Sequence, residues 1–154
     1  EFIEYVMNKN TEQSFLLSEK LIDSIGEQAL LLIFLSQLIF ILEIVGCKEN
    51  KIYNSDTIQE IVEKRDLLVK YFSSEWQEPK YTLKTQNPIR IKIEMSKNRY
   101  NSEQISSMIY NTIDTIDDLR KYGVKSDTPY VRFDKVYHRS YGFIRNDDLM
   151  EVLK

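Results

Sequence analysis

Cysteine, histidine, glycine and proline are all scarce in this chain of 154 residues. It has one cysteine, one histidine, four glycines and three prolines. A single cysteine excludes an intrachain disulfide, and a single histidine excludes a two-histidine metal site. Hydrophobic residues make up 42% of the chain and charged residues 29%, which is typical of a globular protein. We therefore predict one domain, residues 1–154, that needs no disulfide, metal or cofactor to fold.

The charge balance and the use of cysteine restrict location and partners. The net charge is −3, which argues against a general binder of polyanions. The lone Cys47 favours a reducing compartment, so we predict a cytoplasmic protein. Cys47 follows a predicted helix end, whose partial negative charge disfavours a thiolate, and we expect it to be unreactive.

The longest apolar run predicts a helix over about 27–46 that forms the centre of the fold. Its apolar part, from Ala29 to Val45, would extend about 26 Å as a helix, less than the ~30 Å hydrocarbon core of a membrane. Ser36 and Glu43 interrupt it, so we predict no membrane association. Ala29, Ser36 and Glu43 recur at heptad spacing and predict one narrow edge facing water. The other sides pack within this chain or, alternatively, against a second copy through the 27–45 helix.

Other segments predict further helices and a small sheet. Helical spacing and caps indicate helices at about 11–25, 55–76 and 102–122. Alternation of Ile89, Ile91, Ile93 and Met95 with polar residues predicts a strand within a hairpin at about 80–95. Aromatic and β-branched residues predict a second hairpin at about 129–145. The expected fold class is α+β and predominantly helical, with a central apolar helix packed on a small antiparallel sheet from two hairpins.

The predicted second hairpin interleaves cations with aromatic rings. Such a surface suits nucleotide stacking, and it suits a protein interface equally well. The segment from Arg139 to Asn146 resembles the aromatic octamer of RNA-recognition motifs and cold-shock domains, which implies contact with single-stranded bases. Ser140 replaces the first glycine of that motif, and Asn146 replaces its final aromatic residue. The candidate binding residues are Tyr130, Arg132, Tyr137, Arg139, Tyr141, Phe143 and Arg145.

Arg132 and His138 are the candidate catalytic pair. Their spacing resembles the Arg-x4–6-His signature of HEPN ribonuclease domains, and that resemblance implies RNA cleavage by these two side chains. Phe133 follows Arg132 where that family usually has a polar residue, and the surrounding pattern predicts a strand rather than a helix. The alternative is a surface histidine in a hairpin, because geometry rather than spacing makes a catalyst.

The functional hypothesis that follows is a non-enzymatic macromolecule-binding domain of the protein–protein interaction, inhibitor, immunity or accessory-subunit type. No phosphate-binding loop, paired Cys-x-x-Cys or nucleophile elbow occurs in the sequence. We expect another protein as the partner. The alternative is an RNA-binding or HEPN-like ribonuclease domain that uses residues 130–145.

Overall fold

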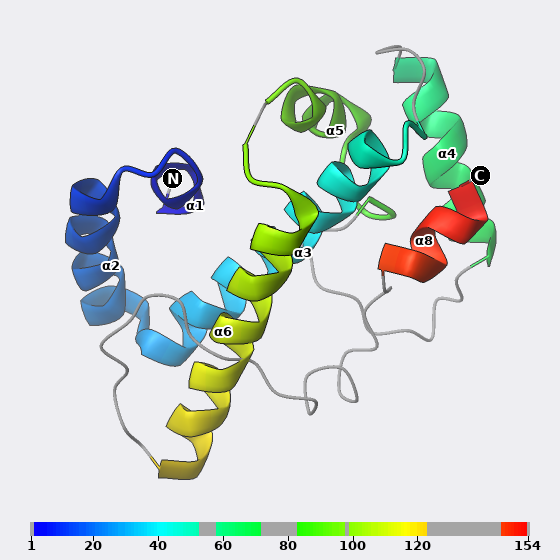
Figure 1. Cartoon of the computed structure of the whole chain (residues 1–154). Helices are drawn as coiled ribbons and strands as arrows, with labels where there is room; N and C mark the ends of the chain where they lie inside the picture. Colours follow the sequence, from blue (N-terminus) through cyan, green and yellow to red (C-terminus); the bar gives the residue numbers. More distant parts are fainter. Residues whose placement is uncertain (1, 53–57, 72–82, 98, 123–145, 154) are drawn as a thin grey trace.

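The computed structural model describes residues 2–52, 58–71, 83–97, 99–122 and 146–153, and their regular elements are helices (Figure 1). No strand occurs among these residues. In chain order the helices are α1 (Phe2–Met7), α2 (Thr11–Ile25), α3 (Glu27–Glu49), α4 (Ile58–Tyr71), α5 (Pro88–Met95), α6 (Ser102–Tyr122) and α8 (Asn146–Leu153).

Local capping explains where α2 and α6 begin. The Asn10 side chain accepts a hydrogen bond of 3.3 Å from the backbone N–H of Gln13 at the start of α2. Before α6, Asn101 Oδ1 accepts from the Gln104 N–H at 2.9 Å, and Gln104 Oε1 accepts from the Asn101 N–H at 3.0 Å. Each side chain thus satisfies a backbone donor of the other, as in a capping box. The Gly26 linker between α2 and α3 has φ +89°, a conformation that favours glycine.

Helix α3 crosses the middle of the molecule and is shared by two hydrophobic clusters (Figure 1). Its first half packs with α1, α2 and α6, and its second half packs with α4, α5 and α8. By length and composition α3 could cross a membrane, and 67% of its most apolar stretch is buried within the protein. Its large side chains that are fully buried are Phe34, Leu35, Leu38, Ile39 and Ile44.

The prediction that Glu43 of α3 faces water is wrong. Ala29 and Ser36 are half-buried, but Glu43 is only 2% exposed. Glu43 Oε2 accepts a hydrogen bond of 2.7 Å from the backbone N–H of Leu83, which lies in the turn before α5. The carboxylate therefore connects the central helix to that turn. The helix also continues past the expected end at Gly46, because Gly46 and Cys47 are buried in the second cluster and the helix ends at Glu49.

The prediction of an α+β fold is wrong for the segment that was expected to pair as a hairpin at 80–95. Residues 88–95 form α5, with Pro88 in its first turn and Asn87 as its N-cap, whose side chain accepts from the Ile89 N–H at 2.9 Å. Ile91 and Glu94 are buried, at helical spacing, while Ile89 and Ile93 face outward. A strand would place Ile89, Ile91 and Ile93 on one face. The predicted hairpin at 129–145 lies outside the described residues.

Candidate functional site

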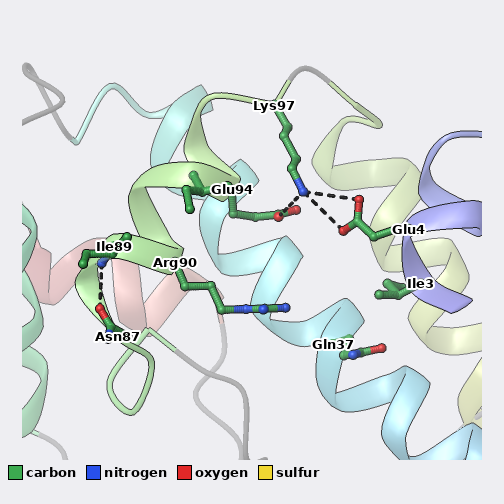
Figure 2. Close-up of a pocket in the computed structure, with 9 residues that line it drawn as sticks. Ile3, Glu4, Gln37, Asn87, Ile89, Arg90, Glu94 and Lys97 are labelled. Carbon is green, nitrogen blue, oxygen red and sulfur yellow. Dashed lines mark hydrogen bonds and ion pairs between the residues drawn. The ribbon is translucent and has the colours of Figure 1, made fainter. Parts of the chain in front are cut away.

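A cavity lies between α1, α3 and α5 (Figure 2). Its volume is about 630 Å³, which is within the range of small-molecule sites. One side is charged, and the α5 rim is apolar. The cavity is lined by Ile3, Glu4, Gln37, Asn87, Ile89, Arg90, Ile93, Glu94 and Lys97.

Four charged side chains form a cluster at one side of this cavity and neutralise one another. Glu4 of α1 lies 2.7 Å from Arg99 Nη2 and 3.2 Å from Lys97 Nζ. Glu94 of α5 lies 3.3 Å from Lys97 Nζ and 3.4 Å from Arg99 Nη1. Figure 2 shows Lys97 between the two carboxylates. This cluster attaches α1 to the C-terminal end of α5 and leaves no excess charge of its own.

The electrostatics of Glu4 follow from that cluster. Partial burial alone would raise the pKa of this carboxyl. The hydrogen bonds and positive charges of Arg99 and Lys97 outweigh that effect and hold the pKa of Glu4 below its ordinary value of 4.5. Glu4 is therefore a structural carboxylate at neutral pH and has the wrong pKa for a general acid.

Arg90 is the cation on the cavity that the cluster does not neutralise. Figure 2 shows its side chain extending from α5 into the space above Gln37. No described residue forms a hydrogen bond or ion pair with the Arg90 guanidinium. The guanidinium is exposed and presents a fork of donors suited to a carboxylate from another molecule.

A second, smaller cavity adjoins the first at Gln37, which lines both. Its volume is about 200 Å³, and apart from Gln37 its lining is apolar. Ile25 of α2 and Ile33 of α3 form its exposed edge. The lining residues are Phe2, Leu17, Leu21, Ile25, Leu30, Ile33, Phe34 and Gln37.

The outer side of α5 completes the candidate site. Ile89 is 55% exposed and Ile93 is 53% exposed, and the exposed cations Arg90 and Lys92 flank them. Lys92, like Arg90, has no polar partner among the described side chains. We call Ile89, Arg90, Lys92 and Ile93 the α5 face. Isoleucines four residues apart on a helix form one ridge, so the α5 face has an apolar centre and a positive margin.

Chemically, this site is suited to binding. Among the residues with described side chains, no group of three or more His, Cys, Asp or Glu residues could hold a metal ion. Cys47, in the last turn of α3, is fully buried. Burial and, after it, the Glu43 carboxylate raise the pKa of its thiol, while Lys64 acts in the opposite direction. The thiol is therefore protonated and inaccessible, in agreement with the expectation that Cys47 is unreactive.

The site residues predicted from the sequence lie outside the described residues. This applies to the proposed catalytic pair Arg132 and His138 and to the aromatic and basic residues of the predicted hairpin at 130–145. RNA binding and RNA cleavage by these residues stay predictions. An oligomer through the 27–45 helix also stays a prediction, although the described helices already bury most of α3, and Ile33 is its exposed large apolar side chain.

The cavity was missed because its residues come from three distant parts of the sequence. Residues 3–4, Gln37 and residues 87–97 meet only after folding. One local signal was present, since Asn87 followed by Pro88 is a common helix start. That signal predicts a helix after Asn87 and places Ile89 and Ile93 on one face, with Arg90 beside them.

Comparisons of this chain with protein-family models, with curated proteins and with solved structures found no match.

Proposed function

We propose that this chain is a non-enzymatic protein-binding domain, and that the α5 face and the cavity beside it form its binding surface. The observation that carries the proposal is the exposure of Ile89 and Ile93, both more than half exposed, at the rim of a cavity of about 630 Å³. Single exposed apolar side chains are ordinary on protein surfaces. Two exposed isoleucines on one ridge beside a cavity form a surface that a partner's side chains can cover.

The expected energy supports an interface here. Full burial of an exposed isoleucine side chain contributes about 1.5–3 kcal/mol. Ile89 and Ile93 are already about half buried, so covering both contributes about that amount in total, which suits the centre of a contact. Arg90 adds specificity, because arginine is common among the residues that dominate interfaces. No described residue accepts a hydrogen bond from the Arg90 guanidinium, so a partner carboxylate can accept a charge-assisted hydrogen bond from it.

The second cavity extends the surface toward α2. It meets the first at Gln37, and its exposed edge is formed by Ile25 and Ile33. An apolar side chain of a partner could enter it while the rest of the partner lies along α5. Two adjoining cavities with one shared polar residue fit a protein chain with several contact points.

The test is affinity capture from native cell lysate with a matched control. The wild-type chain, the variant Ile89→Ser/Ile93→Ser and the control Ile58→Ser/Val69→Ser serve as baits. The control changes two exposed apolar residues of α4. Ribonuclease treatment removes partners that are bridged by RNA, and mass spectrometry identifies what remains.

We expect the wild type and the α4 control to retain the same protein, and the α5 variant to lose it. Retention of an identical set by all three baits would show that the α5 face binds nothing. Loss of the captured protein after ribonuclease treatment would instead favour the RNA-directed alternative. Circular dichroism of each bait establishes that the serine substitutions leave the helices intact.

A further inference from the structure

A second exposed surface of this chain complements the α5 face. Glu12, Phe15, Leu16 and Glu19 of α2 follow the spacing i, i+3, i+4 and i+7, so they form one stripe on the helix. All four are exposed, with Phe15 at 47% and Leu16 at 49%. We call them the α2 stripe. It has an apolar centre between two carboxylates.

The charges of the two surfaces are opposite in sign, and the charged groups on α2 have no partner among the described residues. The side chains of Glu12 and Glu19 form no hydrogen bond or ion pair with any described residue. On α5, the side chains of Arg90 and Lys92 likewise have no polar partner among the described residues. Each surface therefore has two apolar side chains and two charges, and the charges on one match those on the other in number and differ in sign.

These surfaces do not cover each other within one chain. Figure 1 shows α2 on one side of α1 and α5 on the other. The two surfaces can meet only between molecules. We propose that the partner of the α5 face is a second copy of this chain, which binds through its α2 stripe. This inference rests on the proposed function, because it names the occupant of the same surface.

The arrangement of α2, α1 and α5 suits a twofold dimer. If a twofold axis passes near α1, α2 of each copy meets α5 of the other, and both contacts form at once. Such a contact is isologous and closes at two copies. Two helix contacts instead of one bring the buried area toward the ~1,000 Å² that a stable interface needs.

Opposite charges give this proposal a specific test, with the molar mass in solution as the measurement. Variant Arg90→Glu/Lys92→Glu makes the α5 face negative, and variant Glu12→Arg/Glu19→Arg makes the α2 stripe positive. In a dimer of either variant alone, charges of the same sign then face each other in both contacts. Mixed together, they match opposite charges in both contacts, because the negative α5 face meets the positive α2 stripe and the other contact keeps its native charges.

We expect size-exclusion chromatography with light scattering to give the wild type twice the 18.4 kDa of one chain. Each variant alone should dissociate with a dissociation constant at least about tenfold higher than that of the wild type. An equimolar mixture of the variants should regain the dimer mass. That recovery would also show that both variants are folded.

The control variant is Lys51→Glu/Lys70→Glu. It changes the net charge by the same amount as Arg90→Glu/Lys92→Glu, but at two exposed lysines outside both surfaces. It should remain as dimeric as the wild type. A wild type that is monomeric at every concentration would overturn this inference and leave the proposed function to the capture experiment. A dimer that none of the charge variants weakens would also overturn it, because its interface would lie elsewhere.

Discussion

The carboxylate of Glu43 accepts a hydrogen bond of 2.7 Å from the backbone N–H of Leu83, and both residues are almost completely buried. This bond connects the C-terminal half of the central helix to the turn that leads into α5. The position of α5, and with it the cavity and the α5 face, depends on this turn. A polar residue within an apolar helix therefore has a structural purpose here.

Replacement of Glu43 should reveal the strength of this connection. Glu43→Leu leaves the Leu83 N–H buried without its acceptor, so we expect the free energy of unfolding to fall by about 1–3 kcal/mol. Glu43→Gln keeps an acceptor oxygen and should lose less. Urea unfolding followed by circular dichroism measures both. Ser36→Ala on the same helix is the control and should stay within about 0.5 kcal/mol of the wild type. Equal stability of Glu43→Leu and the wild type would refute the role of this bond.

The helical form of residues 88–95 can be tested with two isoleucines. Ile91 is fully buried and Ile89 is exposed. Ile91→Ala should therefore cost about 2–5 kcal/mol of unfolding free energy, and Ile89→Ala less than about 0.5 kcal/mol. Denaturant unfolding of dilute protein, where association does not contribute, gives both values. Similar large losses at the two positions would instead indicate a strand with both side chains on its buried face.

The ion pairs of Glu4 predict a dependence of stability on pH. The pKa of Glu4 is lowered in the folded protein, so its ion pairs stabilise the fold above the unfolded-state pKa. That contribution is lost as the pH falls through the folded-state pKa. From pH 7 to about pH 3 the wild type should therefore lose more stability than Glu4→Gln. The Glu4 side chain is 40% exposed, so the difference should be below about 1 kcal/mol.

Urea unfolding at a series of pH values measures this difference. Glu103→Gln provides the matched comparison, because Glu103 is an exposed carboxylate in the first turn of α6 and has no polar partner among the described side chains. Its stability should follow the wild-type pH profile. A Glu4→Gln profile that runs parallel to the wild type over the whole range would contradict the ion pairs.

The buried thiol of Cys47 should be protected from reagents. Its side chain is inaccessible, and burial raises its pKa, so both the access and the thiolate that a disulfide reagent needs are missing. At pH 8 we expect no reaction of the native protein with Ellman's reagent on the timescale on which the denatured protein reacts completely. Rapid labelling of the native protein would show that the second hydrophobic cluster opens easily.

The sequence was a good guide to the long helices α3 and α6 and a poor guide to the short helix α5. In the segment that forms α3, apolar residues occupy nearly every position, and in α6 they recur at helical spacing over several turns. In α5 three isoleucines alternate with charged residues over one short segment, which also satisfies the pattern of a strand. The Asn87 cap and Pro88 decided in favour of a helix, and α3 and α4 cover only one side of it.

By itself the sequence determined that residues 27–46 form a helix with most of its circumference buried, because no arrangement of so apolar a segment leaves it in water. Only the tertiary structure decided which positions are exceptions. Glu43 is buried because the Leu83 N–H reaches it, and Ile89 and Ile93 are exposed because no described element packs on the outer side of α5. Local patterns record a preference for burial, whereas contacts between distant segments determine which side chains achieve it.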